Sequence, residues 1–182
     1  MKKSLGAKTL LVPTPVWIVG TYDAQGKANG AAVAWGGICC GKPPCVQVSL
    51  RAATYTHGCI LARKAFTVNV PSAAQAKQAD YFGMASGRDT DKFAASGLTA
   101  ARSDLVDAPY IAEFPLVAEC KLVKVVELGL HTMFVGEILD VKADEESIEG
   151  VKPFVYSTLD QSYYALGEKL GAAFNIGKSI KV

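Results

Sequence analysis

Alternating apolar and polar positions predict two long strands in the second half of the chain. From Leu116 to Lys124 apolar residues alternate with charged ones, and the stretch from His131 to Val141 repeats the pattern. A period of two is expected for a strand with one buried face. The connection at Glu127 to Leu130 is of hairpin length. The sequence therefore predicts two paired antiparallel strands here.

Shorter strands are predicted elsewhere. Val16 to Tyr22 is rich in β-branched and aromatic residues, and turn-forming residues separate it from a second extended run that begins near Ala28. Prolines bound two further strands, Cys45 to Leu50 and Phe66 to Val70, because proline cannot continue a β-ladder. A last short strand is predicted from Phe154 to Tyr156.

Helices are predicted to be few. Thr54 to Arg63 is typical of a short helix, and Ser72 with Gln75 forms a capping box before the helix-forming stretch Ala73 to Met84. Many strands, short connections and no regular alternation of strand and helix favour a mainly β fold. We expect a closed or nearly closed antiparallel barrel with two or three peripheral helices. The length of 182 residues predicts one domain, residues 1–182.

Charge and hydropathy exclude some partners and suggest another. A formal charge of +2 without a stripe of Lys and Arg argues against nucleic acid. The longest uncharged apolar stretch, Ala28 to Gly41, is shorter than the ~20 residues that span a bilayer. The start of the chain lacks a signal-peptide pattern, which predicts a cytoplasmic location. A mean hydropathy of +0.20 suggests apolar surface covered by a second subunit, so a homodimer is predicted.

The five cysteines have no recognisable metal-binding spacing. They are odd in number and lack C-x-x-C pairs, so reduced thiols are expected and no metal site is predicted. Buried packing roles are favoured over ligand or redox roles, although a cysteine-based metal or redox protein remains an alternative class. The residues are Cys39, Cys40, Cys45, Cys59 and Cys120.

Familiar catalytic motifs are absent or incomplete. Gly36 to Lys42 is close to the glycine-rich phosphate loop of nucleotide hydrolases, but Pro43 stands where a hydroxyl residue should bind magnesium. No G-x-G-x-x-G motif follows a strand. The two histidines lie in no metal-ligand or nucleophile pattern, so a serine or metal hydrolase is not supported and no catalytic nucleophile is predicted.

The segment Ser49 to Thr56 is a candidate phosphate site. It ends a predicted strand and begins a predicted helix, which brings hydroxyls, free backbone N–H groups and a guanidinium together. Arg51 can bind phosphate oxygens through two hydrogen bonds, and Thr54 or Thr56 can donate a hydroxyl. A plain helix N-cap beside a surface arginine explains the same residues equally well.

Five blocks in register carry a resemblance to a known family. This chain resembles the flavoredoxin branch of the flavin reductase-like family across nearly its whole length. The blocks are AWGGICC at 34–40, SLRAATYT at 49–56, FTVNVPS at 66–72, SGRDTDKF at 86–93 and GLHTMFVGEI at 129–138.

The resemblance implies a fold, a cofactor and an activity. The fold is an FMN-binding split β-barrel, a Greek-key antiparallel barrel, usually a homodimer with FMN near the interface. Family members reduce FMN with NADH or NADPH, or keep non-covalent FMN as an electron carrier. We therefore expect an NAD(P)H-dependent FMN oxidoreductase that moves electrons between a nicotinamide or a redox protein and an acceptor. The alternative is a non-enzymatic FMN electron carrier.

The resemblance also implies site residues. Asn29, Ala34 and Trp35 would line the flavin ring, and the segment that includes Ser49, Leu50, Arg51, Thr54, Tyr55 and Thr56 would bind the ribityl chain and phosphate. Lys92 would lie near the phosphate or ring, His131 would reach the flavin from the second hairpin, and Tyr164 is a candidate aromatic neighbour. Asn69 lies within a strand, where a flavin edge is one solution for its amide. Ordinary packing or solvated roles remain the alternatives for Trp35, Lys92, His131 and Tyr164.

Overall fold

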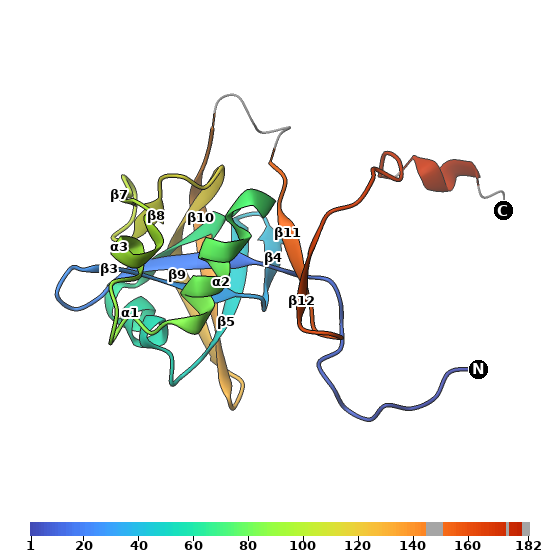
Figure 1. Ribbon diagram of the computed structural model, residues 1–182, viewed down its shortest axis with the longest axis horizontal. Helices are drawn as coiled ribbons and strands as arrows, with labels where there is room; N and C mark the ends of the chain where they lie inside the picture. Colours follow the sequence, from blue (N-terminus) through green and yellow to red (C-terminus); the bar gives the residue numbers. More distant parts are fainter. Residues whose placement is uncertain (145–150, 174, 180–182) are drawn as a thin grey trace.

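A seven-stranded antiparallel sheet forms the body of the computed structural model, which describes residues 1–144, 151–173 and 175–179 (Figure 1). Every pair of neighbouring strands in it is antiparallel. Across the sheet the order is β3 (Ala28–Val33), β2 (Trp17–Tyr22), β6 (Ala65–Val70), β9 (Leu116–Glu127), β10 (His131–Ala143), β5 (Pro44–Arg51) and β4 (Gly36–Gly41). The predicted mainly β fold class is confirmed.

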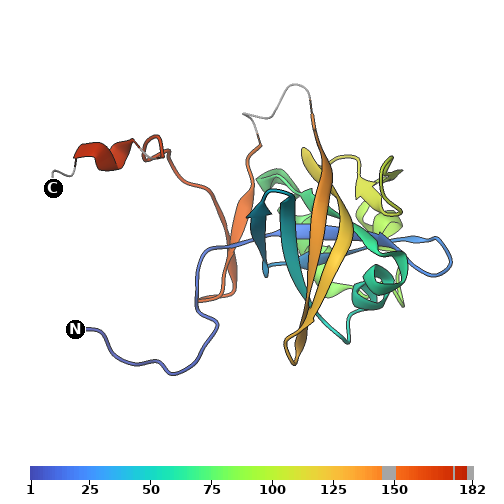
Figure 2. The ribbon, with the colours of Figure 1, turned by 180° about the vertical axis from the view of Figure 1, so that it is seen from behind.

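Both predicted hairpins are present. β2 pairs with β3 from Trp17 opposite Val33 to Tyr22 opposite Ala28, and the Asp23 carboxylate accepts the backbone N–H groups of the turn that joins them. β9 and β10 form a longer hairpin within the sheet (Figure 2). Its turn places Gly129 at a φ of 85°, a conformation that favours glycine.

The sheet curls around an apolar interior. Val19, Val48, Phe66 and Phe134 form one buried cluster with their neighbours. A β-bulge lies between Val135 and Gly136, and a Cβ at Gly136 would fall 2.5 Å from the Phe66 ring. Glycine at this position therefore lets the bulged strand approach the core closely.

Three helices cover the sheet at its edges. They are α1 (Tyr55–Arg63), α2 (Ala76–Met84) and α3 (Lys92–Ser96). The predicted capping box is present, since the N–H of Ser72 donates to the Gln75 side chain at 2.8 Å. The turn that follows is the 3₁₀-helix η1 (Ala73–Gln75), so α2 begins three residues later than predicted. Its buried Phe82 joins a second apolar cluster with Ile18, Phe93 and Ile111.

The remaining strands were not all predicted. Beside the main sheet lies a three-stranded sheet of β1 (Thr14–Pro15), β11 (Phe154–Ser157) and β12 (Ser162–Ala165), and a small pair is formed by β7 (Ala100–Arg102) and β8 (Pro109–Ile111). The glycine-rich β4 was also missed as a separate strand. The first residues of the chain and the segment after β12, which includes the short 3₁₀-helix η2 (Ile176–Ser179), extend away from the main sheet on the same side (Figure 1). Among the described residues no helix is long and apolar enough to span a bilayer.

Candidate functional site

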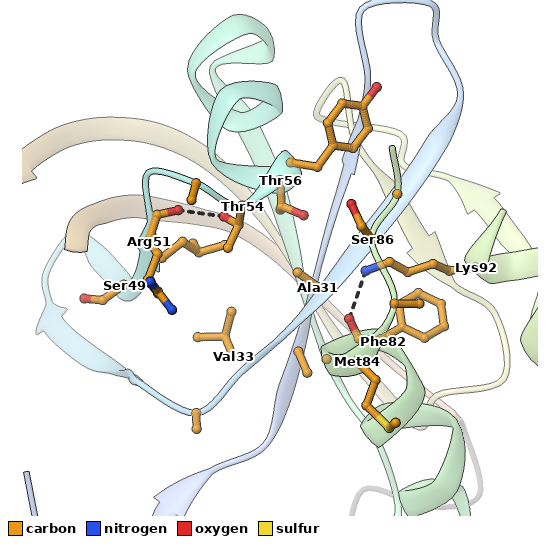
Figure 3. A pocket seen from close by; sticks show the side chains of 18 of the residues that line it. Ala31, Val33, Ser49, Arg51, Thr54, Thr56, Phe82, Met84, Ser86 and Lys92 are labelled. Atoms are coloured by element: carbon orange, nitrogen blue, oxygen red, sulfur yellow. Dashed lines mark hydrogen bonds between the residues drawn. The ribbon is translucent and has the colours of Figure 1, made fainter. Parts of the chain in front are cut away.

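A cavity of about 490 Å³ opens where the ends of β3, β5 and β10 meet the helices (Figure 3). Small residues of β3 and the following loop line one side, and the C-terminal end of α2 with the segment after it lines another. Ten of the sequence-predicted site residues line it: Ala34, Trp35, Ser49, Leu50, Arg51, Thr54, Tyr55, Thr56, Lys92 and His131.

The junction between β5 and α1 directs polar groups toward the cavity. Thr54 precedes the helix, but its hydroxyl makes no capping bond and instead donates to the carbonyl oxygen of Arg51 at 2.8 Å. The backbone N–H of Thr54 donates to the same oxygen at 2.9 Å. This tight turn projects the Arg51 side chain into the cavity beside Ser49 (Figure 3). The interpretation of Thr54 as an ordinary side-chain N-cap does not hold.

A second arginine, which the sequence interpretation did not select, also lines the cavity. Arg88 lies in the connection between α2 and α3, where its Nη1 donates to the carbonyl oxygen of Ala53 at 3.1 Å. Its guanidinium lies 5.5 Å from the centre of the Tyr55 ring. Arg88 therefore connects the two loops that border the cavity. The block SGRDTDKF contained this signal, but only Lys92 was selected from it.

Lys92 is a buried cation with no acidic partner among residues 1–144, 151–173 and 175–179. Its side chain is 5% exposed, and Nζ donates to the carbonyl oxygens of Gly30 at 2.8 Å and Phe82 at 2.9 Å. Burial lowers the pKa of Lys92 to about 8, because removal from water disfavours the charged form. In Figure 3 its ammonium group and the Arg51 guanidinium approach the cavity from opposite sides.

Trp35 and His131 form an aromatic wall. Their ring centroids are 4.4 Å apart with a 38° tilt. Both residues are held against β5. The Trp35 carbonyl accepts the N–H of Ser49 at 2.8 Å, and His131 lies opposite Arg51 in the register of β10 and β5. The cavity thus has an aromatic surface on one side and cationic groups elsewhere.

Asn29 lies just behind the lining residues and keeps an unused acceptor. The side chain is buried, and its Nδ2 donates to Thr56 Oγ1 at 2.9 Å, whereas its Oδ1 has no partner in the described part of the protein. A Cβ at Gly87, a lining residue, would fall 2.2 Å from that oxygen. An unsatisfied buried acceptor costs free energy unless a ligand or water supplies a donor.

The charge of the lining selects for anions. Arg51, Arg88 and Lys92 line the cavity, and no Asp or Glu does so among the residues that the structure describes. An anionic ligand with a flat apolar part would find cations, hydroxyls and aromatic rings in one place. These residues therefore fit FMN, which combines a phosphate, a polar chain and a planar ring.

Two predicted site residues lie elsewhere. Asn69 is fully buried and its amide is satisfied within the protein: Nδ2 donates to Ile18 O and Thr67 Oγ1, and Oδ1 accepts the N–H of Ile111. The expectation of a flavin edge for its amide is therefore wrong. Tyr164, on β12, is half exposed and does not line this cavity; its hydroxyl donates to Asp160.

The cysteines divide into two groups. Cys45, Cys59 and Cys120 are buried, whereas Cys39 and Cys40 are exposed, so the expected buried packing role is wrong for these two. The prediction failed because β4 lies at the edge of the sheet. In the described part of the chain no group of three or more His, Cys, Asp or Glu side chains could hold a metal ion.

Comparison with known proteins gives the family. The model of the flavin reductase like domain matches residues 9–166, so the chain belongs to the flavin reductase-like family. Within it, the chain is similar to flavoredoxin of Desulfovibrio vulgaris (Miyazaki F), with 49% identity and a TM-score of 0.91 over 97% of this chain and all of that one. Flavoredoxin from Methanosarcina acetivorans gives 30% identity and a TM-score of 0.89 over 98% and 99%. The predicted family is confirmed.

The matches to curated relatives cover only part of those proteins. A protein of Aeropyrum pernix without an assigned function is 30% identical over 146 residues, which cover 76% of this chain but 56% of that protein. The chain therefore spans little more than half the length of the first curated relatives that it matches.

Proposed function

We propose that this chain holds one FMN non-covalently in the cavity and passes electrons through it, as an oxidoreductase that takes them from NADH, NADPH or a redox protein. The observation that carries the proposal is a cavity lined by three cationic side chains, an aromatic pair and no described carboxylate, in a chain of this family. The same site serves either electron source.

Different lining residues would contact different parts of FMN. Arg51 and Arg88 would hold the phosphate, because both guanidinium groups border the same opening. Trp35 and His131 would contact the planar ring, and Asn29 Oδ1 would accept a hydrogen bond from it. When bound, FMN supplies hydride acceptance and the release of single electrons.

The protein's contribution is position and charge. Lys92 would place a positive charge near the ring without a competing carboxylate, which favours an anionic reduced state. No side chain needs to act as a nucleophile or general base, so substitutions at the site should change cofactor affinity or reduction potential.

A non-enzymatic electron carrier is the second candidate. The 49% identity with a flavoredoxin over nearly all of both chains favours it. We also propose a homodimer, supported by exposed apolar residues that include Met84, Leu128 and Leu130, together with the extended chain ends. Size-exclusion chromatography with light scattering tests the dimer. The cytoplasmic location stays a prediction.

Two measurements test the function. The purified protein should show a flavin spectrum, or acquire one when titrated with FMN, and should release FMN on denaturation. A colourless protein that takes up no FMN would contradict the proposal. Oxidation of NADH and NADPH by the FMN-loaded protein then separates the candidates: reduction of the flavin by either nucleotide supports the enzyme, and reduction only by a protein such as reduced ferredoxin supports the carrier.

A further inference from the structure

The hairpin of β4 and β5 carries three of the five cysteines at an edge of the sheet. Cys39 and Cys40 lie on β4, the terminal strand of the seven, and are exposed. Cys45 lies on β5 and is 6% exposed. The proposed flavin site uses none of them, since the cavity is lined by residues beyond the other end of this hairpin.

Cys40 and Cys45 face each other across the hairpin. They are direct register partners, one pair away from the Gly41–Pro44 pair that flanks the two-residue loop. Directly opposed residues in an antiparallel pair have Cα atoms roughly 4.5–5.5 Å apart, which falls within the range of disulfide-bonded cysteines. As directly opposed residues, Cys40 and Cys45 carry their side chains on the same face of the hairpin. The register thus places the two thiols within reach of a disulfide without a change of backbone.

Cys39 is positioned differently. The register changes between Ile38 and Cys40, so Cys39 is the extra residue of a β-bulge and has no partner on β5. A bond between Cys39 and Cys40 would join neighbouring residues, whose Cα atoms are about 3.8 Å apart and thus closer than in ordinary disulfides. The geometry therefore favours the cross-strand pair over the adjacent pair.

We propose that Cys40 and Cys45 form a reversible dithiol site that low-molecular-weight disulfides, such as glutathione disulfide, oxidise to a cross-strand disulfide. The Cys40 thiolate attacks one sulfur of the small disulfide, forms a mixed disulfide and releases one small thiol. The Cys45 thiol then loses its proton, attacks the Cys40 sulfur and releases the second small thiol. Two protein thiols become one disulfide, and two electrons and two protons reduce the small disulfide to two thiols.

Exposure sets the order of these steps. Burial is the largest cause that raises the pKa of Cys45, followed by the neighbouring Cys40 and Cys39 thiols. Cys45 is therefore a poor first nucleophile and needs a neighbouring mixed disulfide to react with. The exposed Cys40 is accessible to a small disulfide in solution. An exposed disulfide of this kind is expected to be reduced again readily by small thiols.

The test uses the full-length protein and glutathione disulfide. The reduced protein is incubated with it, quenched by alkylation, and analysed by intact mass and by counting free thiols. We expect the wild-type chain to lose two thiols without retaining glutathione, and to regain them with excess reduced glutathione. Cys39→Ser should behave in the same way. Cys45→Ala should instead retain a glutathione adduct on Cys40, and Cys40→Ser should form no internal disulfide.

Several results would overturn the site. One is a wild-type protein that keeps five free thiols or stops at a glutathione adduct, and another is a Cys39→Ser variant that no longer forms the internal disulfide. Thermal unfolding of each reduced variant verifies that it is folded. If Cys45→Ala is unstable, the test rests on Cys40→Ser, which changes an exposed residue. Because no flavin takes part, the outcome is independent of whether the chain binds FMN.

Discussion

Two buried asparagines show how the barrel interior differs from the rim of the cavity. Asn69, in the interior, uses both ends of its amide on protein groups from three strands or loops. Asn29, at the rim, donates to Thr56 but has no donor for its Oδ1. Buried polar groups in folded proteins are normally satisfied. An amide whose hydrogen bonds are all made within the protein therefore indicates a structural role. An amide with an unpaired oxygen beside a cavity indicates a place where a ligand is expected.

The largest effect should come from Asn69→Ala. The change leaves the Ile18 carbonyl and the Ile111 N–H without their partner in a fully buried position. Each buried group left unpaired costs about 1–3 kcal/mol, so we expect a loss of roughly 3 kcal/mol or more in the free energy of unfolding. Urea denaturation measures it. Flavin affinity of the folded fraction should stay near wild type; a selective loss of affinity would return Asn69 to the site.

Arg51→Ala should have the opposite profile. Arg51 is exposed, so stability should change by less than about 0.5 kcal/mol. Loss of a charge-assisted bond to phosphate, worth about 1.5–3 kcal/mol, should weaken FMN binding by roughly 10- to 100-fold in a fluorescence titration. Riboflavin, which lacks the phosphate, should be affected much less. Arg102→Ala, on the distant β7, is the matched control. Equal losses for FMN and riboflavin would argue against a phosphate contact.

From the lowered pKa of Lys92 we predict opposite pH trends for the stability of the apoprotein and for its affinity for FMN. Its folded pKa of about 8 lies below the ordinary 10.5, so between these values the unfolded chain holds more protons. The stability of the apoprotein should therefore gain a contribution as pH rises from about 8 to 10.5. FMN affinity should fall several-fold over the start of the same range, because the ammonium loses its charge.

Lys92→Met provides the control for both trends. Denaturation and FMN titration at several pH values should show flatter profiles than the wild type. The variant also leaves the carbonyl oxygens of Gly30 and Phe82 without a donor, so its absolute stability will be lower. The comparison therefore rests on the slopes with pH. A wild-type affinity that is constant between pH 7.5 and 9.5 would exclude the proposed charge role.

The smallest effect is expected for Asn29→Ala. The substitution removes the bond to Thr56 but also removes an acceptor that has no partner, so the apoprotein should lose only about 1 kcal/mol. FMN affinity should decrease by roughly 5- to 10-fold, corresponding to one neutral hydrogen bond. Urea denaturation measures the stability loss, and calorimetric titration of the same preparation measures the FMN affinity. A stability loss as large as that of Asn69→Ala would erase the difference between the two regions.

Local pattern was sufficient for much of the fold. The alternation from Leu116 onward predicted β9 and β10, and proline and turn residues bounded β2, β5 and β6 near their observed ends. β4 escaped because its glycines and small residues give no alternation. The start of α2 was misplaced because a capping box specifies a turn but does not distinguish a 3₁₀ from an α conformation.

The site was predicted in part. Ser49 to Thr56 combined hydroxyls and a guanidinium within one short stretch, so their joint appearance at the cavity needed only a strand followed by a helix. Arg88 became significant only when its loop met Ala53 and Tyr55, 35 and 33 residues earlier in the chain. The prediction that Cys39 and Cys40 are buried was wrong because their apolar neighbours in the sequence do not show which strand lies at the edge of the sheet.

The sequence by itself determined the family, the strand-rich character and the grouping of hydroxyls and a guanidinium between Ser49 and Thr56, because these depend on composition and spacing along the chain. Only the tertiary structure decided which polar groups remain available. Asn69 and Asn29 have the same side chain, and their difference arises from partners that the fold brings from distant segments: Ile18 and Ile111 reach Asn69, whereas no donor reaches the Oδ1 of Asn29. Hydrogen-bond satisfaction depends on contacts in space, which local sequence does not specify.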